Sequence, residues 1–341
     1  MRDLRVSVTD RCNFRCLYCL PESDEAAAFY QQKTILGAGH GLPKASPITW
    51  KARDELLTFE EIERVVRLFT SLGIEKIRLT GGEPLLRRGL EDLVKSVASM
   101  PGVVDLAMTT NGFLFPLKGA GLAKAGLRRV SFSMDSLDPE NFKRMTGRAG
   151  LQEVMSSIRL AASLGLAPVK VNAVVIRGIN DHEIETLADF AIQNSLVLRF
   201  IEFMPLDSGK TWQRNMVVPG REILDRLSRS YQLKTLPPKS PSETARRWQF
   251  EGSNAELGVI APVTEPFCGH CNRIRLTADG RIRTCLFSLH EHDLKGLLRS
   301  GCDDATITAR IREIVLGKEE RHHIGEADFV QPDRPMSCIG G

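Results

Sequence analysis

A short pattern recurs three times in this chain and constrains its fold more than any other feature of the sequence. The stretches SLGIEKIRLT, KAGLRRVSFS and SLGLAPVKVN each run from the end of an expected helix, through a glycine, into an apolar strand. The glycines are Gly73, Gly126 and Gly165, and glycine takes the left-handed conformation that ends a helix without steric cost. Helices and strands that alternate at this length predict right-handed crossovers and a parallel sheet.

Six apolar runs are typical of buried strands in such a sheet, and segments of helical periodicity lie between them. These runs span residues 4–8, 75–79, 103–109, 128–133, 169–175 and 197–203. Six strands are two short of a full eight-stranded barrel, so we expect an α/β fold built as a partial (βα)6 TIM-like barrel. An open doubly wound sheet is the alternative. The first long helix should begin after Thr58, which forms a capping-box pattern with Glu61.

The composition changes near residue 236 and indicates a second region. The stretch LPPKSPSETARR is a Pro/Ser-rich connector. The runs beyond it are typical of short antiparallel strands, at 247–250, 257–260, 273–277 and 281–285. We therefore expect a barrel domain at 1–235 and a smaller C-terminal α+β domain at 236–341. Residues 22–54 are rich in Ala, Gly, Gln, Lys and Pro, which predicts a mobile surface insertion.

The net charge and the apolar runs of the chain give no indication of a nucleic-acid-binding, membrane-spanning or secreted protein. A formal net charge of +4 is too small to indicate nucleic-acid binding, although it permits a local basic patch for an anionic small molecule. No apolar run reaches 18 residues, so we expect no transmembrane helix. The start MRDLRVSV lacks the apolar core of a signal peptide. We therefore expect a reducing cytoplasm, where a content of eight cysteines favours metal ligands over disulfides.

Three cysteines lie close together in the stretch RCNFRCLYC. Cys12, Cys16 and Cys19 have the spacing C-x3-C-x2-C, whereas a complete zinc or iron–sulfur site normally takes four protein ligands. Thiolates at this spacing can each bind a different iron of a cubic cluster, which leaves the fourth iron open to a small ligand. The sequence therefore predicts a [4Fe–4S] cluster with one open iron. A zinc site completed by His40 is the alternative.

A second group of three cysteines lies in the C-terminal region. Cys268, Cys271 and Cys285 have the spacing C-x2-C-x13-C, and again no fourth cysteine is close. We expect a second three-cysteine cluster here, with a zinc site that uses His270 as the alternative. The two remaining cysteines have no ligand spacing and are expected to be incidental thiols, namely Cys302 and Cys338.

Polar residues gather where the expected strands end, and this edge carries the active site in parallel α/β folds. GGEP at 81–84 follows the second strand and TTNG at 109–112 follows the third. Later strands contribute Ser133, Asp135, Lys170, Asn172 and Met204. Each motif alone has an ordinary explanation as a turn, a cap or core packing. Polar or cysteine residues at the ends of all six expected strands together predict a ligand pocket across the barrel mouth.

On these motifs the sequence resembles the radical S-adenosylmethionine (SAM) superfamily and, within it, the family of GTP 3′,8-cyclases. The resemblance extends over nearly the whole chain. It rests on LRVSVTDRCNFRCLYC, IRLTGGEPLLRR, TTNG, RRVSFSMD, RFIEFMP, the second cysteine group with NRIRL, and the final Gly340-Gly341. It implies a partial barrel of the radical SAM type.

The resemblance also implies roles for individual residues. The first cysteine group would hold the cluster that binds SAM, and the second would hold an auxiliary [4Fe–4S] cluster whose open iron faces the guanine. The implied SAM contacts are Tyr18, Gly82, Ser133 and Met204. The implied GTP contacts are Arg5, Arg78, Thr109, Lys170, Arg273 and Arg275, with Lys76 and Arg199 as further basic residues. Gly340 and Gly341 match a tail that in the family reaches into the active site.

The implied activity is that of a lyase in the first step of molybdenum cofactor (molybdopterin) biosynthesis. SAM is cleaved to methionine and a 5′-deoxyadenosyl radical, which takes the ribose 3′ hydrogen of GTP. Carbon C3′ then bonds to C8, and the cyclised radical must take up an electron and a proton to give (8S)-3′,8-cyclo-7,8-dihydroguanosine 5′-triphosphate. The implied partners are GTP, an external low-potential electron donor and the next enzyme of the pathway, with a homodimer as one assembly that the family allows. Neither a membrane nor a nucleic acid is implied.

Two alternatives remain open at this point. One is a different radical SAM enzyme with an auxiliary cluster, such as a peptide-modifying enzyme. The other, from a different class, is a zinc-binding nucleic-acid module.

Overall fold

One sheet organises the whole chain in the computed structural model, which describes residues 1–20, 50–207, 210, 212–326 and 328–340. Most of the predicted insertion and the final Gly341 lie outside the described residues. Six parallel strands stand side by side in chain order, as the sequence predicts. They are β1 (Asp3–Ser7), β2 (Lys76–Thr80), β3 (Asp105–Thr110), β4 (Arg129–Ser133), β5 (Lys170–Val175) and β6 (Val197–Glu202).

The C-terminal region extends this sheet at both edges. β10 (Arg273–Leu276) pairs in parallel with β1, and β9 (Glu256–Ile260) pairs in parallel with β6. Antiparallel strands then complete the edges, with β11 (Arg281–Arg283) and β12 (His292–Asp293) beyond β10, and β8 (Arg246–Phe250) and β7 (Leu233–Leu236) beyond β9. Among the described residues β9 and β10 do not pair with each other, so the barrel stays open and the predicted partial barrel is confirmed.

The prediction for residues 257–260 and 273–277 was therefore only partly right. Each of these strands has the antiparallel neighbour that the sequence indicates, β8 for β9 and β11 for β10. On its other side each strand pairs in parallel with a barrel strand, which the short local pattern does not reveal. The sheet also crosses the proposed boundary at 235/236, because β7 contains residues on both sides of it. The division into two domains stays a prediction.

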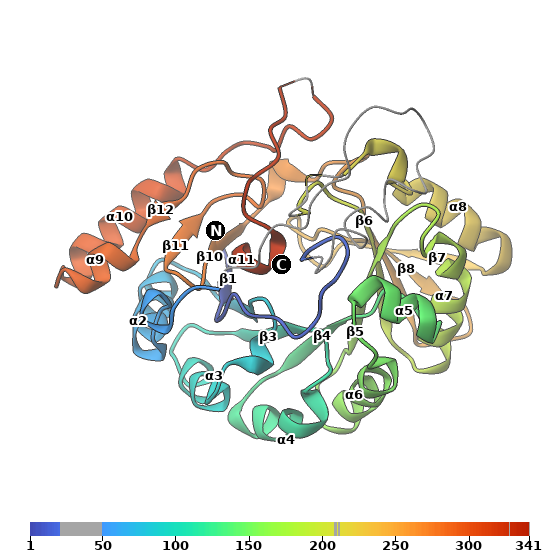
Figure 1. Cartoon of the computed structure of the whole chain (residues 1–341), viewed down its shortest axis with the longest axis horizontal. Helices are drawn as coiled ribbons and strands as arrows, with labels where there is room; N and C mark the ends of the chain where they lie inside the picture. The colour runs from blue at the N-terminus through green and yellow to red at the C-terminus, as the bar shows by residue number, and fades with distance from the viewer. Residues whose placement is uncertain (21–49, 208–209, 211, 327, 341) are drawn as a thin grey trace.

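Helices cover the outer face of the sheet in an arc (Figure 1). They are α2 (Phe59–Ser71), α3 (Leu90–Ala98), α4 (Phe115–Ala125), α5 (Pro139–Thr146), α6 (Leu151–Ser163), α7 (Ile184–Gln193) and α8 (Gly220–Ser230). The predicted capping box is confirmed, because Thr58 Oγ1 accepts from Glu61 N at 3.2 Å and Glu61 Oε2 accepts from Thr58 N at 2.8 Å. The repeat glycines Gly73, Gly126 and Gly165 take φ of +92°, +108° and +73°.

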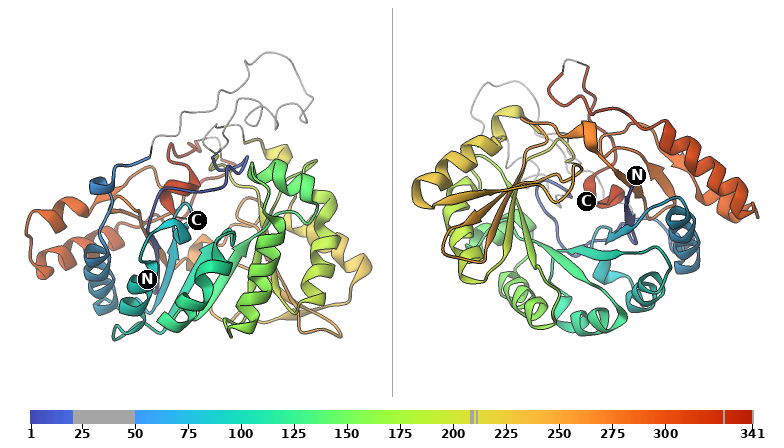
Figure 2. Two further views of the ribbon diagram at one scale, coloured as in Figure 1. Left: turned by 60° about the horizontal axis from the view of Figure 1, so that its bottom comes forward. Right: turned by 180° about the vertical axis from the view of Figure 1, so that it is seen from behind.

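Three further helices belong to the C-terminal region, namely α9 (Lys295–Arg299), α10 (Asp304–Leu316) and α11 (Met336–Ile339). α10 packs beside α2, where Arg64 Nε donates to Asp304 Oδ1 at 2.7 Å. α11 lies inside the open barrel, near the loop that follows β1 (Figure 2). Within the described part of the chain, no helix has both the length and the apolar character needed to cross a membrane.

Strand alternation separates the apolar core from a polar interior. Successive side chains of a strand point to opposite faces of the sheet. On β1, Leu4 and Val6 are fully buried under the helices, so Asp3 and Arg5 face the inside of the barrel. The same alternation on the neighbouring strands places polar side chains around one central space.

Candidate active site

The inside of the barrel contains a cavity of about 410 Å³. Its wall takes alternate residues from seven strands. They are Asp3 and Arg5, Lys76 and Arg78, Asp105 and Thr109, Arg129, Ser131 and Ser133, Lys170 and Asn172, Arg199 and Ile201, and Arg273 and Arg275. All eight residues that the resemblance assigns to the GTP pocket therefore line one cavity, although they come from six different strands.

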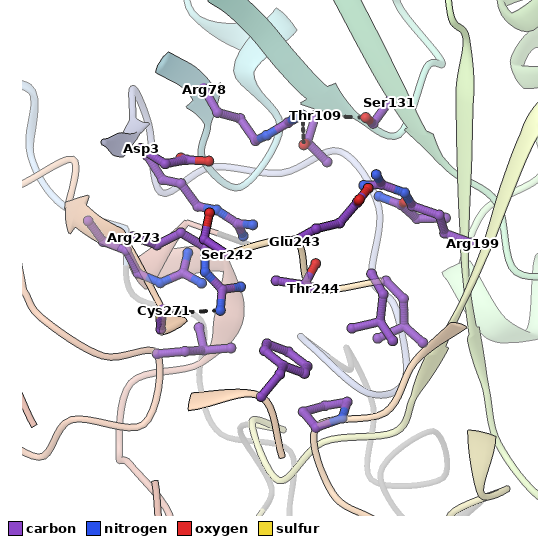
Figure 3. Close-up of a pocket in the computed structure, with 18 of the residues that line it drawn as sticks. Asp3, Arg78, Thr109, Ser131, Arg199, Ser242, Glu243, Thr244, Cys271 and Arg273 are labelled. Carbon is purple, nitrogen blue, oxygen red and sulfur yellow. Dashed lines mark hydrogen bonds between the residues drawn. The ribbon is translucent and has the colours of Figure 1, made fainter. Parts of the chain in front are cut away.

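Three arginines stand side by side in this wall. Strand register pairs Arg5 with Arg275 on one side and with Arg78 on the other. Figure 3 shows Arg78 reaching toward Thr109, and its Nη1 donates to Thr109 Oγ1 and to Ser131 Oγ at 3.3 Å each. Like charges on neighbouring strands repel each other, so this arrangement favours a ligand with several negative charges.

Burial and mutual repulsion lower the pKa of the cations in the cavity. Burial, and then the Arg273 charge, lower the pKa of Arg5 to about 10. Burial also lowers the pKa of Arg78 and of Arg199 to about 10. The largest effect falls on Lys170, because burial and the charges of Arg199, Arg129 and Arg78 lower its pKa to about 6. A bound polyanion would reverse each of these shifts.

Several buried polar atoms in this wall have no hydrogen-bond partner among the described residues. They are Asp3 Oδ1, Arg5 Nε, Asn172 Oδ1, Arg199 Nε and Arg273 Nε. Buried polar atoms in folded proteins are nearly always hydrogen-bonded. Five exceptions around one cavity, three of them on cationic side chains, indicate a site built for a polar, anionic ligand.

The first cysteine group lies in the loop after β1, at one end of this cavity. Backbone hydrogen bonds hold the loop, with Arg15 N donating to Thr146 O at 2.7 Å and Cys19 N donating to Cys16 O at 3.0 Å. The three cysteines do not themselves line the cavity, but Tyr18 does. The loop therefore borders the cavity through the residue between its second and third cysteines.

The GGEP segment packs against the back of the cysteine loop. Gly82 N donates to Thr9 O at 2.8 Å, and a Cβ at Gly82 would stand 2.3 Å from Arg11 O, so only glycine fits. Glu83 is buried and accepts from Thr110 Oγ1 and from Asn111 N, at 2.7 Å each. GGEP and TTNG are thus joined to each other beside the cysteines.

The three thiols of the first group fit a cluster better than a single ion. All three are free and partly buried, and burial raises the pKa of Cys12 to about 11 and that of Cys19 to about 12. Such thiols become thiolates when a positive metal centre compensates their charge. A zinc ion with Zn–S bonds of 2.3 Å would bring its sulfurs to roughly 3.8 Å from one another. In the described residues, neither cysteine group places all three sulfurs within 4.8 Å of one another.

The second cysteine group lines the cavity directly. Cys268 and Cys271 lie at the 3-10 turn Cys268–His270, and Cys285 follows β11. Burial is the largest single influence on the Cys271 thiol and raises its pKa. The Arg273 charge, hydrogen bonds from Arg273 (its Nη2 lies 3.3 Å from the sulfur) and the Lys318 charge together outweigh burial and leave this pKa below its usual value. A thiol that ionises beside an arginine suits a metal ligand.

The predicted tail also reaches the cavity. Met336 of α11 lines it, and Ile339 is fully buried. Arg275 Nη1 donates to the carbonyl oxygen of Gly340. A Cβ at Gly340 would lie 2.6 Å from Thr80 Oγ1, and φ there is +75°, so the position requires glycine. Gly341 lies outside the described residues.

Three of the four residues that the resemblance assigns to SAM binding line the cavity. Tyr18, Ser133 and Met204 line the cavity, whereas Gly82 lies behind the cysteine loop and does not. The roles of these residues remain a prediction, because the structure places them without a ligand.

Several residues of the cavity wall were not predicted from the sequence. Asp3 and Ser131 each stand two positions from a predicted residue on the same strand, and Asp105 and Arg129 each stand four positions from one. Strand alternation could therefore have found all four. A second set comes from the connector, namely Lys239, Ser240, Ser242, Glu243 and Thr244. Figure 3 shows Glu243 extending toward Arg199, and its charge raises the pKa of Arg199 against the larger effect of burial. No local pattern places this connector inside the barrel.

Two family models together match most of the chain. The model of the radical SAM superfamily matches residues 6–191, and the model named Molybdenum Cofactor Synthesis C matches residues 196–324. Among solved structures, Streptococcus suis SuiB bound to S-adenosylmethionine superposes with a TM-score of 0.62 over 98% of this chain and 76% of that one, at 13% identity. This likeness concerns the fold alone. The fold and the match over residues 6–191 define a protein of the radical SAM class, which implies a [4Fe–4S] cluster and SAM as cofactors.

Curated relatives narrow the class. A GTP 3′,8-cyclase of Acidothermus cellulolyticus is 44% identical over 92% of this chain and 82% of its own length. Two others, from Rhodopirellula baltica and Streptomyces coelicolor, are each 42% identical over 99% of this chain and cover 89% and 93% of their own lengths. The chain therefore belongs to the GTP 3′,8-cyclase family.

Proposed function

We propose that this chain is a lyase that converts GTP to (8S)-3′,8-cyclo-7,8-dihydroguanosine 5′-triphosphate, the first step of molybdenum cofactor biosynthesis. The observation that carries the proposal is the group of buried, mutually repelling cations in one cavity that the second cysteine group also lines. A peptide substrate would leave these charges without a counterpart. The relatives named GTP 3′,8-cyclase, at 42–44% identity to this chain, support the same activity.

The two cysteine groups fit the cofactors of this reaction. Cys12, Cys16 and Cys19 would hold the SAM-binding cluster, and Cys268, Cys271 and Cys285 would hold a second [4Fe–4S] cluster at the substrate end of the cavity. When bound and reduced, the first cluster supplies the electron that splits SAM into methionine and a 5′-deoxyadenosyl radical. An external low-potential reductant, a following enzyme that consumes the product and a cytoplasmic location belong to the same proposal.

The chain's own residues bind and orient the nucleotide. Burying a triphosphate without counter-charge would be prohibitive, and each hydrogen bond to a charged group contributes about 1.5–3 kcal/mol. Arg5, Arg78 and Arg275 form adjacent donors on three strands. Arginine side chains of this kind can contact phosphate oxygens in a bidentate manner.

Deuterium transfer tests the proposed reaction. Anaerobic enzyme with SAM, dithionite and GTP deuterated at C3′ should yield 5′-deoxyadenosine that carries one deuterium, because the radical takes the C3′ hydrogen. The nucleotide should be cyclised between C3′ and C8. Unlabelled 5′-deoxyadenosine together with unchanged GTP would contradict the proposed substrate while leaving SAM cleavage intact.

Metal analysis tests the two clusters. Anaerobically reconstituted protein should contain about eight irons per chain, with little zinc. Cys271→Ser should lower the iron content to about four and should preserve reductive SAM cleavage. Zinc at one or two equivalents with no iron, under the same conditions, would instead favour the zinc-binding alternative.

Binding of GTP should take up a proton at Lys170. The pKa of Lys170 in the empty cavity is about 6, so this side chain is mostly neutral at pH 7.5. A triphosphate favours its charged form and raises that pKa, so affinity should fall as pH rises above 6. Calorimetry at pH 7.5 in two buffers of different ionisation enthalpy should show an uptake of up to about one proton per GTP. Lys170→Arg stays charged and should lose this uptake; equal enthalpies for wild type in both buffers would refute the assignment.

A further inference from the structure

A short hydrogen bond ties the cysteine loop to the barrel wall. Tyr18 lies between Cys16 and Cys19, and its hydroxyl donates to Asp135 Oδ2 at 2.5 Å. Asp135 lies two residues after the end of β4, far in sequence from both cysteine groups. Both side chains line the cavity, together with Ser133 and Met204.

Asp135 is itself fixed from two directions. It is only 4% exposed, and its second carboxylate oxygen accepts from Val174 N at 2.8 Å. Its backbone carbonyl accepts from Asn180 Nδ2 at 2.8 Å, and the same amide also donates to Val174 O. β5 therefore holds the carboxylate and the loop after β5 holds the backbone of Asp135, independently of Tyr18.

Apolar packing also anchors the cysteine loop, because Phe14 packs edge-on against two phenylalanine rings and Leu17 is buried in an apolar cluster. Among the described residues, however, few side-chain hydrogen bonds join the loop to the barrel. Arg15 Nη1 donates only to carbonyls within the loop, those of Cys12 and Phe14. Asn111 Nδ2 reaches Asn13 Oδ1 at 2.9 Å on the side of the first cysteine. In the part of the loop after Cys16, the hydrogen bond between Tyr18 and Asp135 is the side-chain link that the described residues show to the end of a barrel strand.

We propose that the Tyr18 hydroxyl and the Asp135 carboxylate form a positioning pair that holds the SAM-binding loop in register with the barrel. Tyr18 OH donates and the carboxylate accepts, so the pair is a charge-assisted hydrogen bond, which is stronger than a neutral one. The pair sets the distance between the loop, where SAM binds, and the cavity wall, where the substrate binds. Neither side chain needs to touch a reacting atom for this role.

Tyr18→Phe tests the proposal with little change of shape. The dissociation constant of SAM is measured on reconstituted, reduced enzyme from the change in the electron paramagnetic resonance signal as SAM is added. We expect the constant to rise about 10-fold, with unchanged iron content. The fraction of 5′-deoxyadenosine that leads to cyclised nucleotide should also fall. Asp135→Asn should do the same, and the double variant should be no worse than either single variant, because both changes remove one interaction.

A matched control exists on the outside of the barrel. Tyr231 OH donates to Asp189 Oδ1 at 2.7 Å between the ends of α8 and α7. Tyr231→Phe should lower the melting temperature to a similar degree and leave SAM affinity at the wild-type value. Wild-type SAM affinity and coupling in Tyr18→Phe would overturn the proposal, as would losses that multiply in the double variant. Tyr18→Phe decides the question by itself if Asp135→Asn does not fold.

The inference rests on the proposed SAM chemistry and not on the identity of the nucleotide. If wild-type enzyme cleaves SAM but forms no cyclised nucleotide, the proposed function fails, whereas the comparison of SAM affinities still decides on the pair.

Discussion

Cys16→Ala should abolish the formation of 5′-deoxyadenosine from SAM, down to the background given by reductant alone. Cys16 is the middle member of a group of three thiols, and a [4Fe–4S] cluster that has lost one of only three protein ligands is no longer held at this site. Liquid chromatography of anaerobic reactions with dithionite measures the effect. Iron content should fall from about eight to about four per chain in the same sample.

Two other cysteine variants make this result specific. Cys302→Ala removes a partly buried thiol outside both groups and should keep wild-type iron content and turnover. Cys285→Ala removes one of the three ligands proposed for the second cluster, so we expect it to stop GTP cyclisation while SAM cleavage continues. If Cys16→Ala still produced 5′-deoxyadenosine at the wild-type rate, the first group would not be the SAM site.

Arg5→Gln should weaken GTP binding about 10- to 100-fold, because a hydrogen bond to a charged group contributes about 1.5–3 kcal/mol. Arg5 lies in the middle of the row formed with Arg275 and Arg78, and its Nε has no partner among the described residues. SAM cleavage that is not coupled to product should survive. Calorimetry with GTP gives the affinity, and the ratio of 5′-deoxyadenosine to cyclised nucleotide gives the coupling.

Stability separates this effect from simple damage to the fold. Burial and the neighbouring Arg273 lower the pKa of Arg5, so the folded state disfavours its charge and the empty protein should not melt earlier without it. Arg226→Gln is the control, since Arg226 forms a bidentate pair with Glu185 on the outer surface, at 3.1 and 2.7 Å. This variant should lose some stability and keep wild-type GTP affinity. Equal GTP affinities for Arg5→Gln and wild type would remove Arg5 from the substrate site.

The parts of the fold that local patterns specify were predictable. The six barrel strands follow from apolar runs, and the helix ends follow from a capping box at Thr58 and from glycines such as Gly73. The clustering of polar residues at strand ends predicted a pocket, and Thr109, Ser133 and Lys170 do line one cavity; the roles of the cysteine groups stay a prediction. The eight predicted GTP-pocket residues line one cavity because strand alternation and a parallel sheet bring the same face of each strand to the centre.

Other parts depend on contacts that no local pattern records. The pairing of β9 with β6 and of β10 with β1 joins segments far apart in the chain, whereas the short apolar runs near each of these strands indicate only its antiparallel neighbour. Glu243 belongs to a Pro/Ser-rich connector, whose composition is the same whether it crosses a surface or enters a cavity. The partner of Tyr18 could not be found either, because a tyrosine hydroxyl carries no periodic signal. Such choices are set by the packing of the whole chain.

The two parallel strands added at the sheet edges have a consequence for how this chain is made. β1 leaves the ribosome long before its partner β10, because the two strands lie far apart in the sequence. The edge of β6 has no partner until β9 is made, and the edge of β1 has none until β10 follows. Unpaired strand edges are templates for aggregation. Contacts between residues so distant in sequence also form slowly. The step that completes the sheet is therefore also the step that brings Arg273, Arg275 and the second cysteine group to the cavity, so a partly synthesised chain cannot assemble the substrate end of its site.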